Sequence, residues 1–422
     1  MLKKLLFLPL IAAALLSSCC NNTPQGAHPD WTYDAVVYEM NVRQYTPEGT
    51  FAAAAEHLPR LAELGVDVVW MMPIYPIGVK ERKGTLGSYY AISDYCATNP
   101  EFGTLEDFDA FVAKAHELGL KVIIDWVANH TSPDALWITE RPADWYVRDE
   151  QGNTIVQYDW TDIAKLNYDN HDMRAEMEKS MRFWMERGID GFRCDMACEM
   201  PFDFWQSVIP SIRKDYPQMY WLAEGEHTEL HNGSFDASYA WELHHLLNAI
   251  ARGEKGVAEL KEYIAKDAAA HPAEAFRLMF TSNHDENSWA GTEFERMRDA
   301  AKVMAMLTFT LPNGQPLIYT GQEMGWNKRF EFFEKDHIPA WENNEYTEFY
   351  KEMIALRHNN AALVAGERGG KIEYIEEVPA GVFAFTRSVE GNSVTVYANL
   401  TNEAVVVGDT TIAAWGWNII TK

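Results

Sequence analysis

Residues 121–130 read KVIIDWVANH, and this stretch decides the fold class. Residues 121–124 are almost all apolar, as in a buried strand. The polar residues Asp125, Asn129 and His130 follow them. Continuous apolar strands are typical of parallel sheets with both faces covered, and parallel α/β folds place their functional groups where the strands end. The stretch therefore predicts a buried parallel strand with a functional site at its carboxyl end.

The same pattern recurs along residues 31–355. Short apolar runs alternate there with amphipathic stretches such as 51–64 and 108–118, which predict helices. We expect strands at 35–38, 66–71, 121–124, 189–192, 219–223, 277–280 and 317–319. This alternation predicts an α/β fold. At this length a closed (β/α)8 TIM barrel is favoured, and a doubly wound sheet is the alternative.

Two segments interrupt the alternation. Residues 131–168 are polar and aromatic and too long for a simple loop, so we expect a subdomain inserted after the third strand. Residues 366–422 are rich in strand patterns, with alternating side chains at 382–385 and 394–397. We expect a small C-terminal β-domain there, a β-sandwich.

The charge of the chain limits its partners. The 422 residues include 36 Lys and Arg against 62 Asp and Glu, a formal net charge of −26. Such a surface repels phosphate backbones, so we expect no nucleic-acid partner. A solvated acidic surface is the simplest interpretation of the charge. The 15 Trp and 19 Tyr fit either a large core or stacking on sugar rings.

The N-terminus has the pattern of a targeting segment. A short positive start precedes the apolar run 5–16, which is too short to span a bilayer, so we expect a signal peptide at 1–18. The end of this run, LSSC, resembles a bacterial lipobox, which predicts lipidation at Cys19 and a tether over 19–30. The alternative is an ordinary secretory signal cleaved near Cys19. From the lipobox we expect a protein of a bacterial cell envelope, anchored to the outer membrane on its periplasmic or surface side.

Four polar groups follow four of the expected strands. They are Asp125 to His130, Arg193 to Asp195, Glu224 to Glu226, and Asn283 to Asp285. In a parallel barrel the carboxyl ends of the strands share one rim, so these groups converge. The sequence therefore predicts that Asp195, Glu224 and Asp285 lie close together.

Three neighbouring carboxylates repel one another and raise each other's pKa, so the arrangement needs a purpose. A metal is one purpose, and acid–base chemistry on a neutral substrate is another. Glycoside hydrolysis requires two carboxyl groups with separate roles, one ionised and one protonated. Arg193 stands two residues before Asp195, on the same face of the strand, and we expect its charge to keep Asp195 ionised.

These stretches resemble the α-amylase family of glycoside hydrolases, family 13, over essentially the whole expected mature chain. The matching stretches are Asp125 to His130, Gly191 to Asp195, Tyr220 to Glu224, Phe280 to Asp285 and Leu311 to Glu323. The resemblance implies a retaining hydrolase that acts on α-glucosidic bonds of starch-derived or related oligosaccharides.

The resemblance also implies a role for each matching residue. Asp195 would be the nucleophile, Glu224 the general acid and base, and Asp285 the transition-state stabiliser. The implied substrate-binding residues are Tyr90, Asp125, His130, Arg193 and His284. Glu226 is the alternative acid, but Glu224 is preferred because it directly follows the apolar strand run.

Two departures from the family pattern affect the expectations. Many members bind calcium between Asn129 and an Asp of the inserted segment, where this chain has Lys165. An ammonium there replaces the charge of the cation, so we expect no metal and no cofactor. After the nucleophile this chain reads Met196 to Glu199 in place of the Lys-His of many α-amylases, which favours short oligosaccharides or glycosyl transfer over endo-acting starch hydrolysis.

Three functional alternatives stay open at this point. A transglycosylase or an isomerase acting on α-glucosides would share the same carboxylates. A protein of another class, a non-catalytic glycan-binding lipoprotein, is expected to lose at least one of them, and all three are present. We expect a monomer, and the linkage that it cleaves stays open.

Overall fold

The computed structural model describes residues 28–422. The expected signal peptide, the lipid anchor at Cys19 and most of the tether lie outside the described residues. Within the described range, no helix combines the length and the apolar character needed to cross a membrane.

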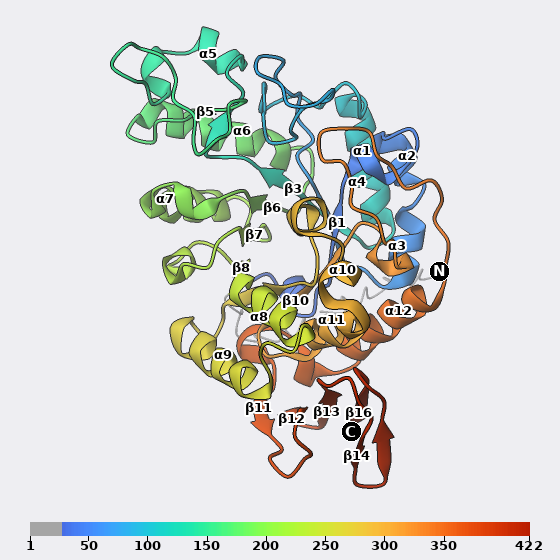
Figure 1. Cartoon of the computed structure of the whole chain (residues 1–422). Helices are drawn as coiled ribbons and strands as arrows, with labels where there is room; N and C mark the ends of the chain where they lie inside the picture. The colour runs from blue at the N-terminus through green and yellow to red at the C-terminus, as the bar shows by residue number, and fades with distance from the viewer. Residues whose placement is uncertain (1–27) are drawn as a thin grey trace, which may run out of the picture.

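Eight parallel strands close into a barrel, as the sequence predicts (Figure 1). Around the barrel their order is β1-β10-β9-β8-β7-β6-β3-β2. Their bounds are β1 (Val37–Met40), β2 (Val68–Met71), β3 (Lys121–Trp126), β6 (Gly191–Cys194), β7 (Tyr220–Ala223), β8 (Ala237–Tyr239), β9 (Phe276–Met279) and β10 (Gly314–Tyr319). The doubly wound alternative is therefore excluded.

Strand β8 is the barrel strand that the sequence analysis missed. It has three residues, and its middle residue Ser238 interrupts any apolar run. Its neighbours β7 and β9 hold it in place through parallel pairing. Closure of the barrel, rather than local sequence preference, makes this segment a strand.

Alternate residues of each strand face the inside of the barrel. The interior is filled by residues such as Val37, Val68 and Ile123, whereas their neighbours pack against the surrounding helices. In a strand, residues i and i+2 face the same side. Glu39, two residues after Val37, and Asp125, two residues after Ile123, therefore also face the inside of the barrel. Buried polar groups therefore lie directly above the apolar interior.

Several helices bury one apolar face against the barrel, whereas nearly every residue of α11 (Ala301–Thr310) is buried. In α4 (Leu105–Glu117), Thr104 and Asp107 form a capping box, and the buried side chains Phe108, Phe111 and Ala115 follow helical spacing. The other helices are α1 (Val42–Tyr45), α2 (Phe51–Ala55), α3 (Leu58–Leu64), α5 (Leu136–Glu140), α6 (His171–Met185), α7 (Phe202–Arg213), α8 (Trp241–Ala251), α9 (Val257–Ala270), α10 (Glu293–Met297), α11 (Ala301–Thr310) and α12 (Glu345–His358).

The segment between β3 and α6 projects from one end of the barrel (Figure 1). It contains α5 and a short antiparallel pair, β4 (His130–Thr131) and β5 (Ala164–Lys165). Its Trp137 and Trp145 rings, whose centroids lie 5.1 Å apart, belong to the same hydrophobic core as the barrel helices. We call residues 131–168 the inserted subdomain.

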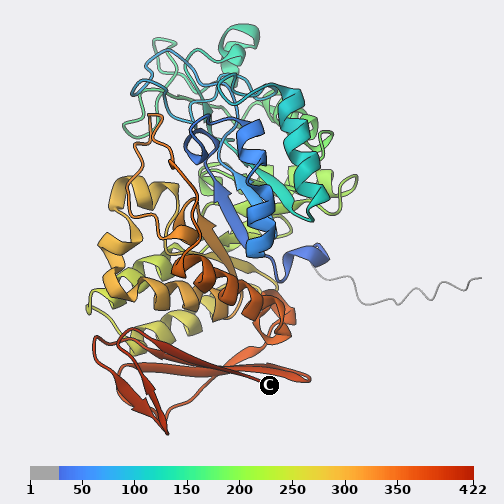
Figure 2. The same ribbon diagram turned by 90° about the vertical axis from the view of Figure 1, so that its right-hand side faces the viewer.

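The C-terminal strands lie at the opposite end of the molecule (Figure 2). A four-stranded antiparallel sheet has the order β11 (Lys371–Tyr374), β12 (Val382–Val389), β13 (Asn392–Asn399) and β16 (Trp417–Thr421). A separate two-stranded sheet joins β14 (Val405–Val407) to β15 (Thr410–Ile412). In place of the expected sandwich of two facing sheets, buried residues of β12 and β13 join the same core as α11 and α12. The barrel helices therefore take the place of a second sheet.

Candidate active site

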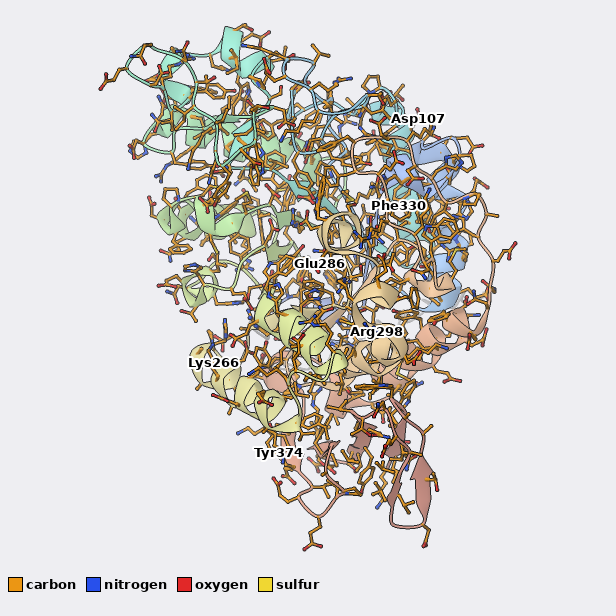
Figure 3. All side chains as sticks on the ribbon, in the orientation of Figure 1. Asp107, Lys266, Glu286, Arg298, Phe330 and Tyr374 are labelled. Carbon is orange, nitrogen blue, oxygen red and sulfur yellow. The ribbon has the colours of Figure 1, made fainter. Side chains whose placement is uncertain are left out.

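One cavity of about 640 Å³ opens at the carboxyl ends of the barrel strands, and Asp195, Glu224 and Asp285 all line it. The predicted convergence of the three carboxyl groups is thus present. Residues of the inserted subdomain, including Trp160, form part of the wall. In Figure 3, Glu286, which follows Asp285, lies on the half of the molecule toward the inserted subdomain, whereas Tyr374 marks the opposite end.

Arg193 is the centre of the charged network. Its guanidinium is completely buried, and Nη1 donates to Asp125 Oδ1 at 2.9 Å and to Asp195 Oδ1 at 3.0 Å. Its Nη2 lies 3.0 Å from Glu224 Oε2. One guanidinium therefore contacts three carboxyl groups from three neighbouring strands, which sets their relative positions.

Arg193 does not keep Asp195 ionised in the way that the sequence predicts. Burial and the Glu224 carboxylate raise the pKa of Asp195 well above its ordinary value, although Arg193 opposes them. The two carboxyl groups share the same cation and repel each other when both are ionised, so the pair tends to keep a proton. The repulsion expected among the three carboxyl groups, together with burial, therefore outweighs the attraction to Arg193.

Glu224 is held by a strained backbone. Met196 adopts a left-handed conformation, with φ 46°, and its N–H donates to Glu224 Oε2 at 2.6 Å. Such a conformation is unfavourable for a residue other than glycine and is typical of functional sites. Oε2 is therefore engaged by Met196 and Arg193, which leaves Oε1 of Glu224 for the cavity.

Glu39 is a site residue that the sequence analysis missed. It is completely buried at the end of β1, and its Oε1 lies 2.5 Å from His284 Nδ1. On its other side, His284 Nε2 lies 2.9 Å from the Tyr90 hydroxyl and 3.3 Å from Asp285 Oδ2. A charged residue inside an otherwise apolar strand, Val37–Met40, was the available signal.

The two carboxylates determine the charge of His284. Burial alone would lower the pKa of His284, but Asp285 and Glu39 outweigh it and raise this pKa to about 9. His284 is therefore charged at neutral pH, with both ring nitrogens donating. Glu39 acts as a positioning residue for His284 and, through it, for Asp285.

Replacing Glu39 by Gln is expected to shift the alkaline limit of activity. The charge on His284 persists up to about pH 9 in the wild type and is lost as the pH rises through that value. Loss of the Glu39 charge lowers the pKa of His284, so the alkaline limb of kcat/KM should move to lower pH. A pH–rate profile from pH 5 to about 10 measures this. An unchanged alkaline limb in an otherwise active variant would contradict the role of Glu39.

Tyr90 and His130 line the cavity, as the resemblance implies. The Tyr90 ring stacks on His284 with centroids 5.4 Å apart, and its hydroxyl bonds Asp125 Oδ2 at 3.1 Å. Burial lowers the pKa of His130 to about 4, so this ring is neutral at pH 7. Because Asn129 Nδ2 donates to His130 Nδ1, the hydrogen lies on Nε2, which has no hydrogen-bond partner among the described residues. His130 can therefore donate to a bound ligand.

Asp125 and Arg193 do not reach the cavity surface. Both are completely buried beneath it, where Asp125 accepts hydrogen bonds from Trp70, Tyr90 and Arg193. Burial raises the pKa of Asp125 to about 6, against the opposing effect of Arg193. Both residues thus lie beneath the cavity and support the side chains that line it, and their contact with a substrate stays a prediction.

Glu226 lies away from the cavity, whereas two tryptophans line it. Glu226, the alternative acid, accepts hydrogen bonds from the Glu242 N–H and from Arg277, and it does not line the cavity. Trp160 and Trp289 line the cavity, and Trp289 is 59% exposed. These two rings are free to contact a ligand.

The residues around Asn129 do not fit calcium. Calcium requires several oxygen ligands. Here the Asn129 amide donates to Gln157 Oε1 at 2.7 Å. Lys165 pairs with His130 in the β4–β5 ladder, and its positive charge further lowers the pKa of His130. The lysine therefore brings a positive charge to the place where a cation would need carboxylates.

Comparisons with known proteins agree with this geometry. The family model described as alpha amylase, catalytic domain, matches residues 21–154 and 137–353. Alpha-amylase MalA of Haloarcula japonica is 29% identical over 397 residues, covering 90% of this chain and 57% of that protein, so this chain spans little more than half of that relative.

Two solved structures are similar over nearly the whole chain. The crystal structure of an alpha-amylase from Lactobacillus plantarum has a TM-score of 0.83 at 28% identity, covering 93% of this chain and 99% of that one. The noncanonic maltogenic alpha-amylase AmyB from Thermotoga neapolitana has a TM-score of 0.81 at 26% identity, covering 92% and 96%. The barrel, its carboxylates at one rim and the family match over most of its length together place this chain in the alpha-amylase family.

Proposed function

We propose that the protein is a retaining glycoside hydrolase that cleaves α-glucosidic bonds in starch-derived or related oligosaccharides. The observation that carries the proposal is the contact of one buried guanidinium, Arg193, with both Asp195 and Glu224 at 3.0 Å beneath a cavity. Retention requires two carboxyl groups close enough for one to attack the sugar while the other protonates the leaving oxygen.

Each carboxyl group has a free oxygen for its step. Asp195 Oδ1 is held by Arg193, whereas Oδ2 has no hydrogen-bond partner among the described residues and is the attacking atom. The retaining mechanism requires the proton of the pair to lie on Glu224 Oε1 when Asp195 attacks. Glu224 donates it to the leaving oxygen and then takes a proton from the water that releases the sugar. Asp285 and charged His284 bind the hydroxyl groups of the same sugar.

The charges in the cavity support a neutral substrate. Five carboxyl groups line it, from Asp159, Asp162, Asp195, Glu224 and Asp285. Lys83 is the one ammonium or guanidinium group among the described lining residues, and it is paired with Asp162. This arrangement repels phosphorylated or acidic sugars. The exposed ring of Trp289 offers a face for stacking on a sugar.

Product analysis tests the proposal. Purified full-length protein is incubated with maltooligosaccharides and with α-1,6-linked and sucrose-type substrates. Cleavage with retained anomeric configuration supports a hydrolase, and the product ladder gives the linkage. Products longer than the substrate would instead indicate a transglycosylase. Binding without turnover on every α-glucoside would contradict the proposal and favour a glycan-binding protein.

We further propose that the chain is a monomeric lipoprotein of a bacterial cell envelope, anchored through Cys19. The lipobox pattern LSSC at 16–19 supports this. An anchor at the end of the tether would leave the cavity accessible to oligosaccharides in the surrounding compartment. Partition of the full-length protein into a detergent phase tests the anchor.

A further inference from the structure

Three segments of the chain together form one wall of the cavity. Lys83 comes from that loop, Asp162 from the inserted subdomain, and Phe333 from the loop between β10 and α12, and all three side chains line the cavity. They are far apart in the sequence, so their meeting is a property of the tertiary structure.

Hydrogen bonds join the first and third of these segments. Leu86 N donates to Phe333 O at 3.1 Å, and Thr85 N donates to Glu334 Oε1 at 2.9 Å. Gly84 has φ +59° and packs so closely on Phe333 that an added Cβ would lie 2.5 Å from its Cβ. The loop after β2 and the loop after β10 therefore form one continuous wall.

The Lys83–Asp162 ion pair connects this wall to the inserted subdomain. Lys83 Nζ lies 3.3 Å from Asp162 Oδ1, and the Asp162 side chain is 4% exposed. The wall is thus continuous from Phe333 through Lys83 to Asp162. We call this continuous wall the closed end of the cavity.

The order of strands around the rim shows where the closed end lies relative to Asp195 and Glu224. From β2 the neighbouring strands are β3, β6 and β7 in turn. Lys83 follows β2, Asp162 follows β3, Asp195 follows β6, and Glu224 follows β7. A chain lying over Asp195 therefore has Glu224 toward one end and the Lys83–Asp162 pair toward the other.

The proposed chemistry determines which end of a substrate meets this wall. Glu224 donates its proton to the leaving oxygen, so the departing part of the substrate lies on the Glu224 side. The sugar attached to Asp195, and any unit beyond it toward the non-reducing end, points to the closed end.

We propose, on the basis of the function proposed above, that the Lys83–Asp162 ion pair stops the non-reducing end of the substrate. The enzyme then acts from chain ends and releases short products of defined length, rather than cleaving inside long chains. The Lys83 ammonium can also donate to hydroxyl groups of the terminal sugar. An internal sugar lacks one of these hydroxyl groups, because that oxygen forms the bond to the next unit.

A pair of end-modified substrates tests this inference. One is para-nitrophenyl α-maltoheptaoside, and the other is the same compound with an ethylidene group on its non-reducing terminal glucose. The wild-type protein is expected to cleave the blocked substrate at least about tenfold more slowly, because the added group meets the closed end. Lys83→Ala should bring the two rates closer together and lengthen the products.

Matched variants separate the ion pair from the loop that carries it. Lys80→Ala removes an exposed lysine from the same loop, outside the cavity lining, and should keep the wild-type rate ratio. Asp162→Asn keeps the size of the side chain and should reproduce part of the effect of Lys83→Ala.

The possible results distinguish this inference from the function on which it rests. Equal rates on both substrates with the wild type would overturn the closed end and leave the proposed hydrolase intact. An unchanged ratio in Lys83→Ala, with the wild type still selective, would overturn the role of the ion pair. No turnover of either substrate by the wild type would overturn the proposed function itself.

Discussion

Replacing Asp195 by Asn is expected to lower kcat on maltooligosaccharides by a factor on the order of 10⁴ or more, as loss of a nucleophile does in other covalent mechanisms. The amide has nearly the same shape, so its oxygen can still accept from Arg193 as Asp195 Oδ1 does at 3.0 Å. The amide nitrogen, however, cannot form the bond to the sugar that Oδ2 forms. Steady-state kinetics and the product ladder measure the loss.

The same variant should not be less stable than the wild type. The pKa of Asp195 is raised in the folded state by burial and by Glu224, so its ionised form opposes folding above its unfolded pKa. A neutral Asn removes this cost, and the melting temperature at pH 7 should stay the same or rise. Asp169→Asn, which changes an exposed carboxylate, is the control. Substantial turnover by Asp195→Asn would contradict the assignment of the nucleophile.

Replacing Arg193 by Met should both abolish turnover and destabilise the fold. Three carboxyl groups, on Asp125, Asp195 and Glu224, would lose the cation that they share. Removing one partner of a buried ion pair costs about 3–5 kcal/mol, because the remaining charge stays buried without compensation. Denaturant unfolding measures the change in the free energy of unfolding.

The loss of stability should depend on pH in a defined direction. The pKa of Asp125 is already raised from 3.8 to about 6 in the folded wild type, so its ionisation weakens folding as the pH rises from about 4 to 6. Without Arg193 this pKa rises further, and the penalty grows over a wider range. The variant should therefore be destabilised more at pH 8 than at pH 5.

A surface ion pair provides the comparison for Arg193. Arg252→Met removes an exposed partner of Glu254 and should leave the unfolding transition nearly unchanged. Equal destabilisation of Arg193→Met at pH 5 and pH 8 would contradict the view that unpaired carboxylates cause the loss.

The sequence by itself determined the fold class and the three carboxyl groups that meet in the candidate site. Apolar runs such as residues 121–124 end in polar side chains, and parallel topology brings such ends to one rim, so Asp195, Glu224 and Asp285 were predicted together and line one cavity. The same local logic failed for β8, whose three residues become a strand only because the barrel closes around them.

The tertiary structure alone decided how these groups are charged and how far the cavity extends. Electrostatic effects depend on distance in space. The balance between the repulsion of Asp195 by Glu224 and its attraction to Arg193 therefore cannot be read from the sequence, and neither can the contact of His284 with Glu39, 245 residues away. The Lys83–Asp162 pair is similar, because the loop after β2 and the inserted subdomain must meet before it can form. Patterns along the chain report which side chains face inward, whereas pKa values and cavity walls arise from contacts between residues that the sequence keeps far apart.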